Sequence, residues 1–176
     1  AGTVALGQAG EALEAALVKA GDNRAELEAF IFTAQKTHSD LGQRAAEFLV
    51  EGMPERDLTS LNRQFLTENL DLAMKARKEF PWCAQLPEAL FFNEVLPYAS
   101  LDETRERWRP DFYKKCRAIV AKSSTATEAA QALNSKIFNL INVHYNTGRK
   151  QPNQSPAESI AQGRATCTGL SIILVD

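Results

Sequence analysis

The segment Ser155–Asp176, SPAESIAQGRATCTGLSIILVD, carries the clearest local structural signals in this chain. Ser155 is a preferred capping residue, Pro156 suits the first helical position, and Glu158 completes a capping box. Gly163 then follows as a helix stop. These residues predict a short helix that ends at Gly163, and a second helix that carries the apolar residues beyond it.

Cys167 follows a second capping residue, Thr166, just before the apolar run Leu170–Val175. A thiol in the first turn of a helix meets the positive end of the helix dipole and unpaired N–H groups, which favour the thiolate. The same N–H groups can stabilise the negative oxygen that forms when a thiolate attacks a carbonyl. Cys167 is therefore the candidate nucleophile. From the residues alone, the alternative is an inert core cysteine.

Upstream of this segment, apolar residues recur at helical spacing. The spacing, with capping residues and glycine or proline stops, predicts helices over residues 12–20, 24–35, 41–49, 57–79, 111–122 and 127–145. Alternating strand patterns are almost absent. We therefore expect a mainly α chain with a helical module over residues 1–122. A polar break at Ser123–Thr125 separates it from a second region over residues 123–176.

The composition excludes several classes of protein. With 44% hydrophobic and 24% charged residues, the 176-residue chain is neither disordered nor fibrous. Its net charge of −2, with no evident basic stripe, argues against a nucleic-acid partner. The longest apolar run is far shorter than the ~20 residues that a membrane span needs.

Cysteine and histidine usage limits the chemistry further. The chain has three cysteines, no C-x-x-C pair and two histidines, so a zinc site is not expected. Cys83 and Cys116 are able to pair in an oxidising compartment, or to stay as two free thiols, and the spacing does not decide between these states. No cofactor is expected.

The C-terminal residues resemble the opening of a bacterial transglutaminase-like core. Asn142-Val143-His144-Tyr145 matches the family's tyrosine-containing loop, which follows a helix. The S-P-x-E residues 155–158 are followed by Gly163 and, four residues after it, by Cys167, in the same order as in the family. The resemblance covers residues 127–176. It implies a papain-like α/β fold with a Cys-His-Asp triad, with Cys167 as the nucleophile that forms a thioester from an amide or peptide bond. The implied partner is a peptide or protein substrate.

The chain departs from that family in one important respect. The family's histidine and aspartate lie on strands after the cysteine helix, whereas His38 and His144 precede Cys167 and match neither motif. We expect His144 to be a surface or packing residue on a helix. We therefore expect the chain to be the front part of a longer cysteine hydrolase or acyltransferase, truncated after the cysteine helix and inactive alone. The alternative is a non-catalytic helical binding or scaffold domain.

Three further expectations follow from the resemblance and the local pattern. The chain lacks a charged and apolar leader at its start, and the family includes exported proteins, so we expect an exported protein whose signal peptide has been removed, with the cytoplasm as the alternative. The apolar cysteine helix needs a cover, which a second copy of the chain would supply in a homo-oligomer. Arg149 and Lys150, in the polar loop before Ser155, are candidates for contact with substrate or for simple solvation.

Overall fold

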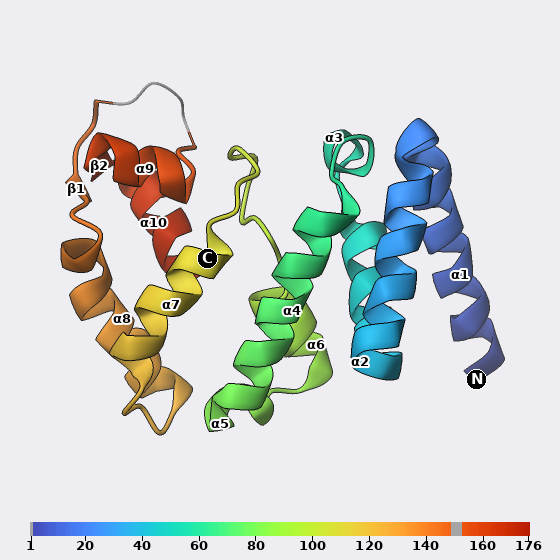
Figure 1. Ribbon diagram of the computed structural model, residues 1–176, viewed down its shortest axis with the longest axis horizontal. Helices are drawn as coiled ribbons and strands as arrows, with labels where there is room; N and C mark the ends of the chain where they lie inside the picture. Colours follow the sequence, from blue (N-terminus) through green and yellow to red (C-terminus); the bar gives the residue numbers. More distant parts are fainter. Residues whose placement is uncertain (1, 149–152) are drawn as a thin grey trace. The chain divides into compact units, whose positions relative to one another are not determined.

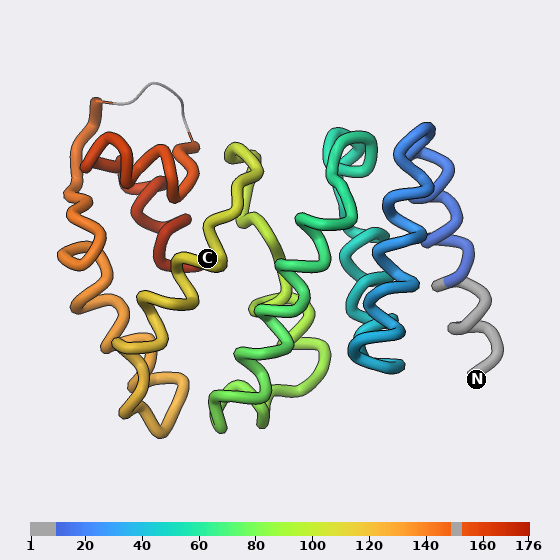
Figure 2. The backbone as a smooth tube through the Cα atoms, viewed as in Figure 1, coloured from blue at the N-terminus to red at the C-terminus, as the bar shows by residue number. Residues whose placement is uncertain are grey.

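The computed structural model describes residues 2–148 and 153–176, and the side chains from residue 10 onward within these ranges. The described chain is mainly helical, with two strands of two residues each, so the predicted helical fold class is confirmed. It forms two compact units (Figures 1 and 2). Unit 1 contains residues 1–74 and 88–96, and unit 2 contains residues 75–87 and 97–176.

Unit 1 begins with two long helices, α1 (Gly2–Lys19) and α2 (Arg24–Gly52), which lie side by side (Figure 1). A short 3-10 turn joins them, and Gly21 adopts a φ of +56° there, which explains why a glycine stops the first helix. Residues of unit 1 that lie in its buried core include Leu17, Leu27, Phe30, Leu66, Leu70 and Phe91.

Helix α2 is interrupted at the point where the sequence predicts a new helix. Ser39 has a φ of 58° and a ψ of −151°, so the two halves of α2 are separate helical segments. Gly42 makes the break sterically feasible, because a Cβ there would lie 2.4 Å from the carbonyl oxygen of Ala34 and 2.5 Å from the Cβ of His38. The predicted separation of residues 24–35 from 41–49 is therefore confirmed as a kink.

The single helix predicted over residues 57–79 is wrong, because the structure divides it into α3 (Glu55–Leu58) and α4 (Arg63–Glu79). Asn62 causes the restart, since its side-chain oxygen accepts the N–H of Phe65 at 2.9 Å. The side-chain amide of Asn23 donates hydrogen bonds to the carbonyl oxygens of Leu58 and Leu61, at 2.8 and 2.9 Å, and these bonds hold the turn between α3 and α4. Helix α6 (Glu88–Leu90) and the π-helix η2 (Phe91–Val95) complete unit 1.

Unit 2 contains α5 (Pro81–Ala84) and a pair of packed helices, α7 (Arg109–Val120) and α8 (Ala126–Leu140). The residues of its core are Trp108, Phe112, Ile137, Ile141, Val143, Ala165 and Ile173. Helices α7 and α8 lie on opposite sides of residue 122 and belong to the same compact unit. The division into residues 1–122 and 123–176 stays a prediction.

Helix α8 differs from the predicted helix 127–145 at both ends. Its N-cap is Thr125 and not Thr127, because the Thr125 hydroxyl accepts the N–H of Glu128. It ends at Leu140, and Asn142 turns the chain with a φ of 54°. The following residues form β1 (His144–Tyr145), which pairs in parallel with β2 (Arg164–Ala165).

Candidate functional site

The segment that leads to Cys167 folds as its local signals predict. Helix α9 (Pro156–Gln162) begins with a complete capping box, in which the Ser155 hydroxyl accepts the N–H of Glu158 and the Glu158 carboxylate accepts the N–H of Ser155. It ends at Gly163, whose left-handed φ of 63° turns the chain into β2. The two predicted helices of this segment are therefore confirmed.

Gln154 fixes the start of helix α10 (Cys167–Val175). Its side chain is fully buried. The amide oxygen accepts the N–H of Thr166 at 3.1 Å, and the amide nitrogen donates to the carbonyl oxygen of Arg164 at 3.3 Å. One side chain thereby hydrogen-bonds to a carbonyl group of strand β2 and to the N–H of the residue that caps α10. It therefore sets the position at which the helix begins.

Cys167 occupies the first position of α10, as predicted, and its side chain is exposed. The Thr166 hydroxyl accepts the N–H of Gly169 at 3.3 Å. Within the described residues, the N–H groups of Cys167 and Thr168 have no hydrogen-bond partner. The first turn of α10 therefore carries the thiol and two backbone donors, and such donors can stabilise an oxygen that gains negative charge.

Helix α10 approaches α9 closely at Gly169. A Cβ at this position would lie 3.0 Å from the Cβ of Ala165 and 3.3 Å from both the Gln154 Oε1 and the Ser159 Oγ. Ser159 is fully buried, and its hydroxyl has no hydrogen-bond partner among the described groups. Gly169 therefore allows one segment of the chain to pack closely on another.

The other two cysteines are less available than Cys167. Cys83 is buried and Cys116 is half-buried, and neither forms a disulfide. Burial raises the pKa of the Cys83 thiol, and burial also raises the pKa of Cys116 to about 11. Both thiols are therefore protonated and poorly nucleophilic at neutral pH.

The structure does not bring either histidine into a catalytic pairing with Cys167. His144 lies in β1, exposed and in register with Arg164, so its predicted position on a helix is wrong. The helix pattern failed there because the left-handed turn at Asn142 ends it early. His38 belongs to unit 1, where its Nε2 lies 2.6 Å from the Oδ1 of Asp71.

Neither a metal-binding cluster of side chains nor a helix that could span a membrane is found in the described part of the chain. No group of three or more histidine, cysteine, aspartate or glutamate side chains could hold an ion there. No helix within residues 2–148 and 153–176 is long and apolar enough to cross a bilayer. Arg149 and Lys150, the candidates for contact with substrate, lie outside the described residues.

The charge distribution is a feature that the sequence analysis missed. Unit 1 holds 14 acidic and six basic residues, a net charge of −8, whereas unit 2 holds eight acidic and 14 basic residues, a net charge of +6. The net charge of −2 for the whole chain conceals this separation. Counting charges in windows along the chain would have revealed it, since most of unit 2 lies after residue 96.

Comparisons with known proteins give no relative. No family model matches the chain, and neither the curated proteins nor the solved structures contain a match.

Proposed function

We propose that these residues form the nucleophile-bearing part of a transglutaminase-like cysteine hydrolase or acyltransferase. The observation that supports the proposal best is the exposed Cys167 at the first position of α10, where the N–H groups of Cys167 and Thr168 have no hydrogen-bond partner among the described residues. Gln154 and Thr166, which are both buried, hydrogen-bond to the backbone at this helix start. A preorganised donor pair beside a nucleophile suits acyl transfer, because negative charge develops on the carbonyl oxygen.

The reaction would proceed through a covalent intermediate. The Cys167 sulfur attacks the carbonyl carbon of an amide, and the N–H groups of Cys167 and Thr168 stabilise the oxygen of the tetrahedral intermediate. Collapse breaks the C–N bond, releases the protonated amine and leaves a thioester on Cys167. Water then yields the acid, or a second amine yields a new amide, and either step regenerates the thiol.

Acceptance of the thiol proton requires a base. The described residues form no hydrogen bond or ion pair between Cys167 and a histidine. In the proposed enzyme, as the family resemblance implies, the histidine and its aspartate lie on strands that follow the cysteine helix. The exported location and the peptide or protein substrate belong to the same proposal.

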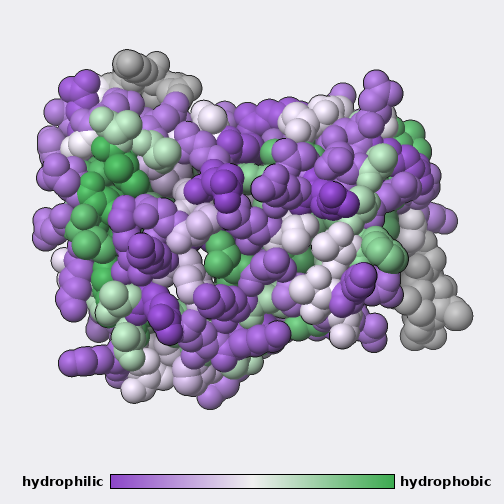
Figure 3. Space-filling view, viewed as in Figure 1, coloured by the Kyte–Doolittle hydropathy of each residue, from purple (hydrophilic) through white to green (hydrophobic). Residues whose placement is uncertain are grey.

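The apolar character of α10 also supports a larger core. Apart from its threonine and serine, the helix carries apolar residues on all sides. This pattern is typical of helices that are buried by other parts of a protein on every side. Leu174 and Val175 are nevertheless exposed by 41% and 67%. Apolar side chains also gather along the edge of unit 2 where α8 and β1 lie (Figure 3). A sheet that covers this face in the full enzyme, or a second copy of the chain, would remove it from water.

The experiment compares the 176-residue chain with the protein encoded by the reading frame continued beyond Asp176. Each is incubated with a glutamine-containing peptide, and ammonia release and amine incorporation are measured. We expect the continued protein to turn over the peptide, Cys167→Ala to abolish turnover, and the 176-residue chain to be inactive. Cys116→Ala is the matched control and should retain activity, because its thiol is half-buried on α7.

Two results would contradict the proposal. Turnover that persists in Cys167→Ala would exclude Cys167 as the nucleophile. A continued frame without strand patterns that carry a histidine and then an aspartate, together with absence of turnover, would favour the alternative, a helical binding or scaffold domain.

A further inference from the structure

Helix α2 folds back on itself at Ser39. In an unbroken helix, residues 34 and 42 would lie about 12 Å apart along the axis. Here a Cβ on Gly42 would lie only 2.4 Å from the carbonyl oxygen of Ala34. Residues 24–38 and 40–52 therefore form a helical hairpin whose turn is Ser39, and Figure 2 shows this reversal where the tube changes from blue to cyan.

Ser39 holds this turn in a strained conformation. It is the only residue of α2 with a non-helical backbone, and its φ of 58° and ψ of −151° fall in a region that almost only glycine adopts. Ser39 and Asp40 are exposed, and residues 35–41 contain no proline or glycine. A rotation of the backbone at this one residue would therefore relieve the strain and join the two halves of α2 into a continuous helix of 29 residues.

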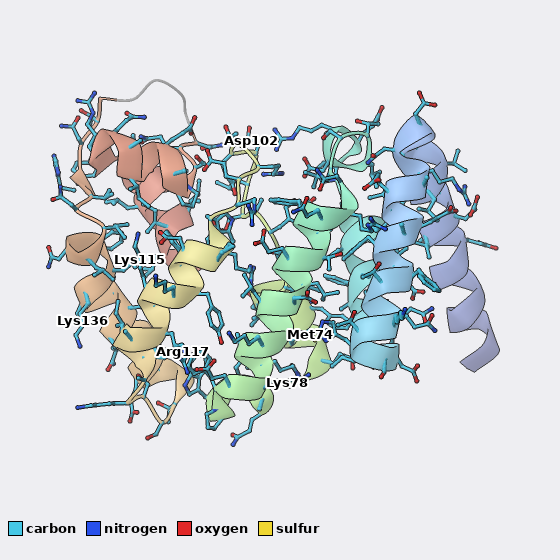
Figure 4. The ribbon with its side chains drawn as sticks, in the orientation of Figure 1. Met74, Lys78, Asp102, Lys115, Arg117 and Lys136 are labelled. Carbon is cyan, nitrogen blue, oxygen red and sulfur yellow. The ribbon has the colours of Figure 1, made fainter. Side chains whose placement is uncertain are left out.

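The turn divides unit 1 into two parts, which we call the arm and the body. The arm is residues 2–38, which contain α1 and the first half of α2, two helices that pack on each other. The body is residues 40–74 and 88–96. Figure 4 labels Met74, a buried residue of the body on α4. Since Ser39 alone connects the two parts along the chain, its rotation moves the arm as a whole.

Hydrogen bonds attach the arm to the body at points far along the chain from the turn. Asn23 of the arm donates to the carbonyl oxygens of Leu58 and Leu61, at 2.8 and 2.9 Å. The carboxylate of Glu26 accepts the N–H of Arg63 at 2.7 Å. These contacts require that an arm pack on a body, and they do not require that both belong to one chain.

Apolar contacts attach the arm as well. The side chains of Leu27, Phe30 and Ala34 belong to the core of unit 1 and are exposed by no more than 2%. A continuous α2 would carry them away from their own body and into water, which is unfavourable. The body of a second copy offers the arm the same surface, because the two chains have the same sequence.

We infer that two copies of this chain form a dimer by exchanging their arms, with α2 continuous in each copy. Each arm packs on the body of the other copy, so the hydrogen bonds of Asn23 and Glu26 form between chains. Release of the strain at Ser39 favours the exchanged form, as is general for short strained hinges. The lost freedom of two associating chains opposes it, so the dimer gains population as the protein concentration rises.

A distance within one chain distinguishes exchanged arms from any other dimer. The 176-residue chain with Ala25→Cys, Glu51→Cys and Cys167→Ser is spin-labelled, mixed with an excess of unlabelled chain, and refolded from urea at high concentration. Monomer and dimer are separated by size, and pulsed electron paramagnetic resonance measures the distance between the labels. We expect about 39 Å in the dimer, set by a rise of 1.5 Å per residue along a continuous helix. The monomer should give a much shorter distance, because its helix folds back.

Substitutions at the turn should shift the equilibrium in opposite directions, as measured by sedimentation velocity over a concentration series. Ser39→Gly should raise the dissociation constant of the dimer by about tenfold or more, because glycine adopts the turn without strain and weakens a continuous helix. Ser39→Ala should lower it, because alanine is strained in the turn and favours a helix. Ser60→Gly, between α3 and α4, is the matched control and should leave it unchanged, since both forms keep that turn. Circular dichroism checks that every variant is folded.

Three results would overturn the inference. The first is that the wild-type chain and Ser39→Ala both stay monomeric at all concentrations. The second is a dimer that keeps the short distance between the labels, which would assign association to another surface, such as the apolar residues of α10. The third is an equal shift of the dissociation constant in Ser39→Gly and Ser60→Gly.

Discussion

The side-chain oxygen of Gln154 accepts the backbone N–H of Thr166 at 3.1 Å, across 12 residues of sequence. This hydrogen bond joins the start of α9 to the start of α10, because Gln154 directly precedes the capping residue Ser155. The register of Cys167 at the first helical position therefore depends on a residue that lies outside both helices.

Replacement of Gln154 by leucine should destabilise unit 2. The change leaves the N–H of Thr166 and the carbonyl of Arg164 buried without their partner, and each lost partner costs about 1–3 kcal/mol. We expect the free energy of unfolding, measured by urea denaturation, to fall by about 2 kcal/mol or more. Gln131→Leu, on the exposed side of α8, is the control and should change it by less than about 0.5 kcal/mol. Equal effects of the two changes would contradict the role of Gln154.

Gly169→Ala should destabilise the protein although alanine favours helices. The new Cβ would lie 3.0 Å from the Cβ of Ala165 in β2 and 3.3 Å from the Oγ of Ser159 in α9, so α10 must move away from both, at a cost of about 1–3 kcal/mol. Gly52→Ala, at the end of α2, meets no atom within 4 Å and should be neutral or stabilising by about 0.5 kcal/mol. Thermal unfolding of both variants checks the contrast. A Gly169→Ala protein as stable as the wild type would show that the helices separate freely.

Cys167 should be alkylated faster than Cys83 and Cys116 in the folded protein. It is exposed, whereas burial covers the other two thiols and raises their pKa values. Iodoacetamide labelling at several pH values, followed by peptide mass mapping, gives the three rates. In urea, where all three thiols are exposed, the labelling rates of the three cysteines should become similar. Faster native labelling of Cys83 or Cys116 would argue against a preformed nucleophile site.

Tyr113 should ionise late in an alkaline titration. Burial, and then its hydrogen bond to Glu79, raise the pKa of Tyr113 to about 12. The folded state thus retains the phenolic proton more tightly than the unfolded chain. This contribution to stability is complete below pH 10 and is lost as the pH rises towards 12. Tyrosinate absorbance should show that one of the three tyrosines titrates at a higher pH than tyrosine does in the unfolded chain. Tyr113→Phe should remove this late phase of the titration. A late phase that persists in this variant would assign it to another tyrosine.

Local chemistry explains which parts of the fold were predictable. The capping box at Ser155 and Glu158 and the cap at Thr166 depend on residues within one turn, so a short stretch of sequence contains the whole signal. The position of Cys167 followed from the same signals. The kink at Ser39 was also predicted, because capping residues interrupt the apolar pattern there.

Contacts between distant residues explain the failures. The pairing of His144 with Arg164 joins strands of two residues, which are too short to produce an alternating pattern. The role of Gln154 depends on a fold in which Arg164 and Thr166 already lie beside it. The charge separation does not appear in the net charge of −2 for the whole chain, because the opposite charges of the two units cancel there.

The break at Ser39 also limits how cooperatively α2 can unfold. A continuous helix of 29 residues would transmit its hydrogen-bond ladder from end to end, but a backbone with a φ of 58° in its middle interrupts that ladder. Amide hydrogens on the two sides of Ser39 therefore belong to separate opening units and exchange with deuterium at independent rates. Hydrogen–deuterium exchange should therefore resolve two groups of α2 amides, one on each side of Ser39.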